Sequence, residues 1–258
     1  MSNELVLREN RDAVLTLTMN RPERKNAFNN PLYKAFAAAL QDAQKDDDVH
    51  VVVVTGTAGS FSAGQDFSEM NAAPTGDSGP HGFQVLMDTL CSFDKPLIAA
   101  VNGVAVGIGM TMLLHCDVVY LAESVRMRCP FVTLGVVPEA ASSYLLPLII
   151  GFQRAAEVLY TAQWIDAPRA LELGLAARVV PDSDVLAVAQ AKAAEIAAHP
   201  PRAVQHSKQL LLATRNDAVR AARKREDDAF AVRIGSPENI EAITAFFEKR
   251  PADFRKKK

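Results

Sequence analysis

The fold class follows from a short segment near the middle of the chain, Lys95-Pro96-Leu97-Ile98-Ala99-Ala100-Val101-Asn102-Gly103-Val104-Ala105-Val106-Gly107-Ile108-Gly109. Its apolar run, Leu97–Val101, is typical of a strand that is buried on both faces. The glycines that follow allow tight turns and a close approach of the backbone to a ligand. An apolar helix is expected next, from about Met110 to His115. A strand that passes through a glycine turn into a helix is typical of an α/β protein.

Similar strands lie on both sides of this segment. Val49–Thr55 contains four consecutive valines, and Asp117–Leu121 is also mostly apolar. A helix is expected over Leu32–Gln44, which follows a proline and is rich in alanine. Leu5–Leu7 and Val14–Leu17 predict an N-terminal hairpin. Strands separated by helices predict an α/β fold with mainly parallel pairing.

The last third of the chain has a different pattern. Beyond a short strand at Ala176–Val180, helical apolar spacing predicts helices over Ala187–Ala198, Ala203–Ala213, Asn216–Ile234 and Pro237–Lys249. We therefore expect a core over residues 1–198 and a helical region over residues 199–258. A loop rich in Ala, Pro, Gly, Asp and Ser, Asn71–Gly82, is expected to form a mobile lip over a pocket.

Composition excludes several classes of function. The 258 residues are 49% hydrophobic and 22% charged, and the net charge of −2 gives no basic surface for nucleic acid. No apolar run approaches the ~20 residues of a membrane span. Cys91, Cys116 and Cys129 have neither disulfide nor metal-site spacing, so we expect no metal and a cytoplasmic, reducing location.

Two glycine-containing turns predict a site for negative charge. Thr55–Asp66 and Val101–Gly109 each lead from a buried strand into a turn with several glycines. Free backbone N–H groups at such turns, together with a helix N-terminus, suit an anion or a developing oxyanion. Neither segment has the spacing of a phosphate-binding loop.

Five segments resemble the crotonase (enoyl-CoA hydratase/isomerase) superfamily across almost the whole chain. They are Arg21–Phe28, Phe61–Asp66, Lys95–Gly103, Gly107–Gly109 and Phe246–Phe254. The resemblance implies a spiral of β-β-α turns with a C-terminal helical trimerisation region. It also implies an acyl-CoA thioester substrate, and assembly as a homotrimer or a dimer of trimers. No cofactor is implied, because CoA enters only as part of the substrate.

The resemblance also assigns roles to individual residues. The backbone N–H groups of Ala63 and Ile108 would bind the thioester oxygen. Phe230 and Lys249 match positions that reach CoA held by a neighbouring subunit. The remaining residues expected to bind CoA are Arg24, Lys25, Ala27, Phe61, Gln65 and Asp66. For Asp66 the residues alone favour a different role, as the cap of a following helix.

Departures from the family pattern indicate the subclass. Hydratases of this superfamily use two glutamates, and the matching positions here are Thr111 and Phe131, which cannot act as general bases. Val137-Pro138-Glu139 instead resembles the motif of Δ3,Δ2-enoyl-CoA isomerases, in which one acid moves the proton. Apolar neighbours would raise the pKa of Glu139. Without the resemblance, Glu139 is equally well explained as an acid in the first turn of a helix.

We therefore expect an isomerase that converts 3-enoyl-CoA to trans-2-enoyl-CoA. The alternatives within the enzyme class are an enoyl-CoA hydratase that uses Glu139 with water, and an isomerase that forms or opens rings in aromatic acyl-CoA catabolism. The alternative from another class is a catalytically weak acyl-CoA-binding homologue.

Overall fold

A six-stranded sheet forms the centre of the fold in the computed structural model, which describes residues 4–67 and 80–255. Its strand order is β1-β2-β3-β5-β7-β10. The first two strands form the predicted antiparallel hairpin, and the others pair in parallel. The bounds are β1 (Val6–Arg11), β2 (Val14–Met19), β3 (Val51–Gly56), β5 (Leu97–Val101), β7 (Val118–Ala122) and β10 (Arg178–Val180).

A second sheet of short strands lies beside the first, in the order β4-β6-β8-β9. Its members are β4 (Ser60–Ser62), β6 (Val104–Val106), β8 (Arg126–Arg128) and β9 (Ile165–Asp166). Strands β3, β5 and β7 each lead within a few residues into β4, β6 and β8, respectively. This repetition is the predicted spiral of β-β-α turns. The short strands themselves were not predicted, because two or three residues are too few to show a periodic pattern.

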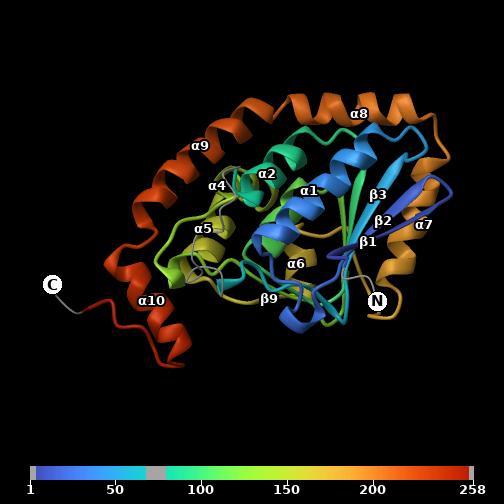
Figure 1. Cartoon of the computed structure of the whole chain (residues 1–258). Helices are drawn as coiled ribbons and strands as arrows, with labels where there is room; N and C mark the ends of the chain where they lie inside the picture. The colour runs from blue at the N-terminus through green and yellow to red at the C-terminus, as the bar shows by residue number, and fades with distance from the viewer. Residues whose placement is uncertain (1–3, 68–79, 256–258) are drawn as a thin grey trace.

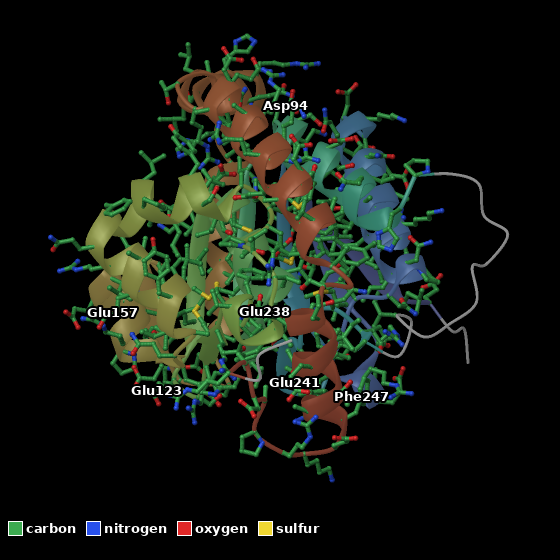
Figure 2. All side chains as sticks on the ribbon, turned by 90° about the vertical axis from the view of Figure 1, so that its left-hand side faces the viewer. Asp94, Glu123, Glu157, Glu238, Glu241 and Phe247 are labelled. Carbon is green, nitrogen blue, oxygen red and sulfur yellow. The ribbon has the colours of Figure 1, made fainter. Side chains whose placement is uncertain are left out.

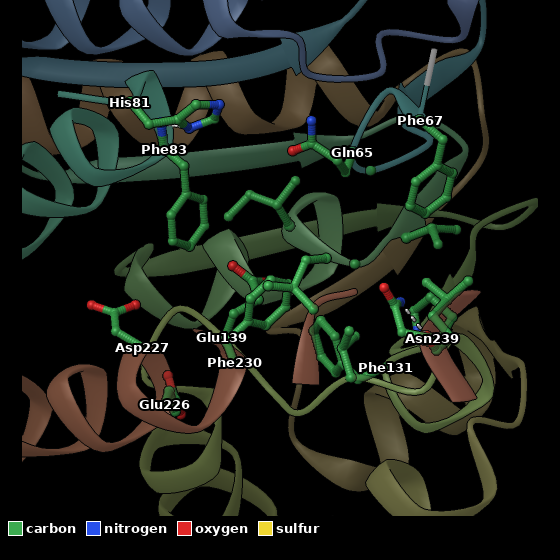
Figure 3. Close-up of a pocket in the computed structure, with 18 of the residues that line it drawn as sticks. Gln65, Phe67, His81, Phe83, Phe131, Glu139, Glu226, Asp227, Phe230 and Asn239 are labelled. Atoms are coloured by element: carbon green, nitrogen blue, oxygen red, sulfur yellow. Dashed lines mark hydrogen bonds between the residues drawn. The ribbon is translucent and has the colours of Figure 1, made fainter. Parts of the chain in front are cut away.

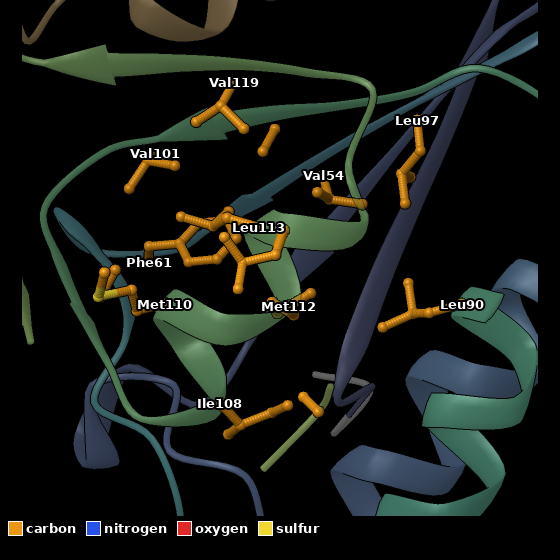
Figure 4. Close-up of a cluster of buried hydrophobic side chains, with 14 of the residues drawn as sticks. Val54, Phe61, Leu90, Leu97, Val101, Ile108, Met110, Met112, Leu113 and Val119 are labelled. Carbon is orange, nitrogen blue, oxygen red and sulfur yellow. The ribbon is translucent and has the colours of Figure 1, made fainter. Parts of the chain in front are cut away.

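Helices cover the six-stranded sheet and bury its apolar side chains (Figure 1). Helix α1 (Asn30–Lys45) packs on α2 (Gly82–Ser92), and α7 (Val185–Ala197) packs across β2, β3, β5 and β7. Strand β3 is buried along its whole length, as its valines predict. Figure 4 shows Val54 of this strand in one cluster with Phe61 and Leu113.

The remaining helices are shorter or lie towards the C-terminus. The short ones are η1 (Pro22–Arg24), α3 (Ile108–Thr111), η3 (Met112–His115), η4 (Val132–Leu134), α4 (Ser142–Ile150), α5 (Phe152–Thr161) and α6 (Ala167–Leu173). The helix predicted over 110–115 is therefore α3 continued by the tighter turn η3. No helix in the described ranges is long and apolar enough to cross a membrane.

The C-terminal helices α8 (Pro201–Ala213), α9 (Asn216–Arg233) and α10 (Pro237–Phe247) run around the outside of the core. Figure 2 shows α10, with Glu241 and Phe247, at the foot of α9. Lys208 fixes α8 to the sheet, because its Nζ donates to the carbonyl of Lys95 and to Oδ2 of Asp117 at 2.7 and 2.8 Å.

The boundary predicted between residues 198 and 199 falls between α7 and α8. Helix α9 packs on α4, and α10 packs on η4, so both helices lie against the core of their own chain. The division into a core and an oligomerisation region stays a prediction. The lip predicted over Asn71–Gly82 lies outside the described residues, except for its last three positions.

Candidate active site

The two glycine turns singled out in the sequence lie side by side. Strands β4 and β6 pair in parallel, so the chain leaves both at the same edge of the second sheet. Gly64 has a φ of +93°, and a Cβ atom there would lie 2.7 Å from the carbonyl oxygen of Val106. A Cβ on Gly109 would lie 2.6 Å from the carbonyl oxygen of Ser62. The turns can approach this closely only because both positions are glycine.

A cavity of about 440 Å³ opens beside these turns. Five of the residues that the sequence assigns to catalysis or CoA binding line it, namely Ala63, Gln65, Ile108, Glu139 and Phe230. Figure 3 shows Glu139 and Phe230 on one side of the cavity and Gln65 on the other. The fold therefore brings Glu139 together with both glycine turns, from three separate parts of the chain.

One of the two backbone N–H groups predicted to bind the thioester oxygen, that of Ala63, is already paired within the protein. The N–H of Ala63 donates a hydrogen bond to the carbonyl of Lys25 at 2.9 Å. A donor that is already paired inside the protein has no proton left for a thioester oxygen. The sequence prediction for Ala63 was therefore wrong, because it could not foresee that the turn containing Lys25 packs on this segment.

Gln65 and Ile108 carry the backbone donors that remain available. Gln65 forms a parallel bridge with Phe28, in which the hydrogen bonds involve Gly64 and Asp66. In this pattern the N–H of Gln65 points away from Phe28. This N–H group has no acceptor within the described ranges. Ile108 is the first residue of α3, where an N–H has no partner inside the helix. Both residues line the cavity.

Glu139 carries a carboxyl group with two different environments. Its Oε1 accepts a hydrogen bond from the hydroxyl of Thr111 at 2.6 Å. Its Oε2 is shielded from solvent and has no hydrogen-bond partner in the described part of the chain. Burial raises the pKa of Glu139 to about 8, against the opposing effect of the Thr111 hydrogen bond, and the negative charges of Glu226 and Asp227 raise it further.

The loop that presents Glu139 is held by two buried side chains that the sequence analysis did not assign to the site. His115 lies with Nε2 2.8 Å from the carbonyl oxygen of Ala140. Burial lowers the pKa of His115 to about 4, so the ring is neutral and donates through Nε2. Ala140 and Ala141 both have positive φ values, 60° and 58°, which are strained for alanine. A strained loop of this kind needs such fixed contacts.

Glu226 of α9 provides the second anchor. Its two carboxylate oxygens accept hydrogen bonds from the N–H groups of Ala141 and Ser143, at 2.6 and 2.8 Å. These groups belong to the start of α4, where free N–H groups favour a negative charge. Glu226 is buried, and its pKa is raised mainly by burial. In the sequence it is one of several charged residues on a polar helix, so no local signal marks it.

Several residues expected to bind CoA lie elsewhere. Phe61 is fully buried in the core, and Asp66 forms a buried ion pair with Arg21 at 3.0 Å. Arg24 and Lys25 are exposed on the η1 turn, which lies against the first glycine turn. The helix that Asp66 was expected to cap falls mostly on residues outside the described ranges.

Three further residues predicted to bind CoA can be placed in the structure. Ala27 is buried, and its carbonyl oxygen accepts from Arg21 at 2.6 Å. Lys249 is exposed beyond the end of α10. Phe230 lines the cavity of its own chain, because α9 packs on α4 of the same chain. Its predicted contact with CoA held by a neighbouring subunit stays a prediction.

Thr111 and Phe131 occupy the positions where a pair of acids was expected for a hydratase. Thr111 is fully buried and binds Glu139, and Phe131 contributes an apolar wall to the cavity. A hydroxyl group bound to Glu139 and an aromatic ring on the cavity wall therefore stand in place of the two glutamates.

Comparison with known proteins gives consistent matches. The family model for enoyl-CoA hydratase/isomerase matches residues 9–257. A 2,3-dehydroadipyl-CoA hydratase of Escherichia coli strain K12 is 37% identical over 99% of both chains. An enoyl-CoA delta isomerase 2 of Rattus norvegicus is 33% identical over 92% of this chain and 62% of the rat protein. A crystal structure of an enoyl-CoA hydratase/isomerase from Pseudoalteromonas atlantica T6c superposes with a TM-score of 0.94 at 39% identity, covering 97% of this chain and 99% of that one.

Proposed function

Since the chain belongs to the enoyl-CoA hydratase/isomerase family, we propose that it isomerises 3-enoyl-CoA thioesters to trans-2-enoyl-CoA thioesters. One observation carries the proposal. Glu139 has a carboxyl oxygen that is shielded from water and unpartnered in the described part of the chain, in the cavity that contains both glycine turns. An acid in this position is available to the substrate alone.

The proposed reaction needs one carboxyl group. The ionised carboxylate of Glu139 removes a proton from C2, and the electron pair moves towards the thioester oxygen to form a dienolate. The same carboxyl group then returns the proton at C4, and the double bond ends between C2 and C3. The proton count is conserved, and neither water nor a metal takes part.

The backbone N–H groups of Gln65 and Ile108 are suited to stabilise the dienolate. Both are on the cavity wall, and Ile108 adds the positive end of the short helix α3. One such donor contributes roughly 2.7–4 kcal/mol to the stability of a transition state. This contribution is required because the C2 proton of a thioester is a far weaker acid than a carboxylic acid.

The pKa of Glu139 supports the same role. A carboxyl group with a pKa of about 8 is a stronger base than an ordinary glutamate, and near neutral pH both of its protonation states are populated. A residue that must first accept and then donate a proton benefits from this balance.

An enoyl-CoA hydratase is the second candidate, and the 37% identical hydratase of Escherichia coli favours it. Against it stand Thr111 and Phe131 at the positions where the family pattern places two glutamates. A hydratase here would have to position water with Glu139 alone. The buried side chains around that carboxyl group favour a reaction without water.

Separate incubations with a 3-enoyl-CoA and with a 2-enoyl-CoA test the proposal. We expect the first to be converted to the trans-2-enoyl product and the second not to be hydrated, both followed by chromatography of the thioesters. Rapid hydration of the 2-enoyl-CoA would select the hydratase. Tight binding of both thioesters without turnover would indicate a binding protein.

Assembly, cofactor use and location belong to the same proposal. We infer a homotrimer or a dimer of trimers from exposed apolar side chains on the C-terminal helices, among them Val232 at 76% and Phe247 at 53% exposure. The reaction uses no cofactor, because proton transfer and oxyanion stabilisation complete it. The three cysteines are free, which favours a reducing compartment such as the cytoplasm.

A further inference from the structure

The wall of the cavity around Glu139 is rich in aromatic rings. They come from separate elements and include Tyr33 of α1, Phe83 at the start of α2, Phe131 and Phe230. Tyr33 and Phe83 meet edge to face, with ring centres 5.8 Å apart and planes at 88°. Rings held by one another form a rigid wall that favours a flat apolar group over a flexible polar one.

Three acidic side chains lie on the cavity wall. Glu139, Glu226 and Asp227 line it, and no lysine or arginine is among the described residues that do so. Residues 68–79, outside the described ranges, also contain no lysine or arginine in the sequence. His81 also lines the cavity, and its Nδ1 accepts a hydrogen bond from the N–H of Phe83.

One arginine lies close behind the wall but is already paired. Arg223 contacts Gln84, which lines the cavity, with its Nη2 3.3 Å from Oε1 of Gln84. The Nη1 of Arg223 forms an ion pair with Asp88 at 2.8 Å. A carboxylate at the end of a substrate's acyl group would therefore meet acidic groups and aromatic rings without a free positive partner. Burying a carboxylate in such surroundings is strongly unfavourable.

We infer that this cavity selects uncharged acyl groups with a flat apolar body, such as arylacetyl groups, and rejects acyl groups that end in a carboxylate. The inference rests on the proposed function, because it assumes that the acyl chain of a CoA thioester enters this cavity. It adds the substrate class, which neither Glu139 nor the glycine turns determine.

Binding of saturated thioesters tests this specificity without requiring turnover. Hexanoyl-CoA, adipyl-CoA and phenylacetyl-CoA share the whole CoA moiety, so differences in Kd by calorimetry report the acyl group. We expect adipyl-CoA to bind at least about 30-fold more weakly than hexanoyl-CoA, since its terminal carboxylate loses water without gaining a partner. Phenylacetyl-CoA should bind at least as tightly as hexanoyl-CoA.

Three variants, one of them a matched control, probe the cause. Asp227→Asn changes an exposed side chain, so the variant should fold normally. It should narrow the difference in Kd between adipyl-CoA and hexanoyl-CoA. Phe83→Lys supplies the missing cation and should improve adipyl-CoA binding, whereas Phe83→Leu, the matched control, should not. Phe83→Leu should weaken phenylacetyl-CoA selectively.

The outcomes separate this inference from the proposed function. Equal or tighter binding of adipyl-CoA by the unmodified protein would overturn the inference even if 3-enoyl-CoA is isomerised. The expected order of affinities without isomerisation would leave the inference standing and overturn the proposed function. Failure to bind any of the three thioesters would overturn both.

Discussion

The hydroxyl of Thr111 lies 2.6 Å from Oε1 of Glu139, across a separation of 28 residues in sequence. Thr111 ends the helix that begins at Ile108, so one short element carries both a proposed oxyanion donor and the hydrogen-bond partner of Glu139. The second carboxyl oxygen of Glu139 is left for the substrate. This relationship fixes which part of the carboxyl group reacts, and the first prediction follows from it.

Thr111→Val should move the pH dependence of isomerisation to higher pH. The Thr111 hydrogen bond lowers the pKa of Glu139, so its loss should raise this pKa above its value of about 8. Because the base is the ionised form, kcat/KM then reaches its plateau at a higher pH. A profile of kcat/KM between pH 6 and 10 measures the shift. Thr111→Ser keeps the hydroxyl and serves as the control; an unmoved profile in Thr111→Val would contradict the assignment.

Glu226→Gln should shift the same profile in the opposite direction. The charge of Glu226 raises the pKa of Glu139, so its removal should lower this pKa and bring the plateau to lower pH. One of the two bonds to Ala141 and Ser143 is also lost, at a cost of about 1–3 kcal/mol in unfolding free energy. Urea unfolding measures the second effect. A loss of stability with an unshifted pH profile would reduce Glu226 to a structural role.

Glu139→Gln should reduce isomerisation by ~100- to 10,000-fold, the usual contribution of a positioned acid/base. Glutamine keeps the size and the hydrogen bond from Thr111 but cannot take a proton. Exchange of the C2 proton of a bound thioester with heavy water can be monitored by NMR. This exchange should disappear in Glu139→Gln. The Kd of the thioester should change little. Persistent exchange in the variant would place the base on another residue.

Gln65→Pro removes the backbone N–H that we assign to the thioester oxygen. We expect a loss of at least ~100-fold in turnover, the effect of one missing donor. Gln65→Ala keeps the N–H and loses only the side-chain hydrogen bond from Tyr33, so it should retain most activity. Circular dichroism checks that both variants fold. Full turnover by a folded Gln65→Pro protein would show that the oxyanion lies elsewhere.

Light scattering at micromolar concentration should give three or six times the monomer mass. We expect this assembly because α8, α9 and α10 expose apolar side chains that an interface would bury. Leu210, Leu211 and Val232 are all more than 70% exposed in the single chain. Val232→Glu should weaken the assembly, whereas Val232→Thr should preserve it. A monomeric unmodified protein would remove the case for an interface on these helices.

The sequence alone determined the fold class and singled out Glu139 as the candidate acid. Four consecutive valines in β3 and the apolar run of β5 predict buried parallel strands, because local hydrophobic patterns report burial directly. The motif around Glu139 identified the carboxyl group by resemblance. Helices α8, α9 and α10 also appeared within a few residues of their predicted bounds, since their caps and apolar spacing are local features.

Only the tertiary structure decided which groups act together. Whether the N–H of Ala63 or that of Gln65 is free depends on the turn at Lys25 that packs beside them, and no local pattern encodes this contact. Glu226 reaches Ala141 across 85 residues of sequence, and its role exists only because α9 folds onto the start of α4. The raised pKa of Glu139 has the same origin, because burial is a property of the assembled cavity and not of the residues next to it in the chain.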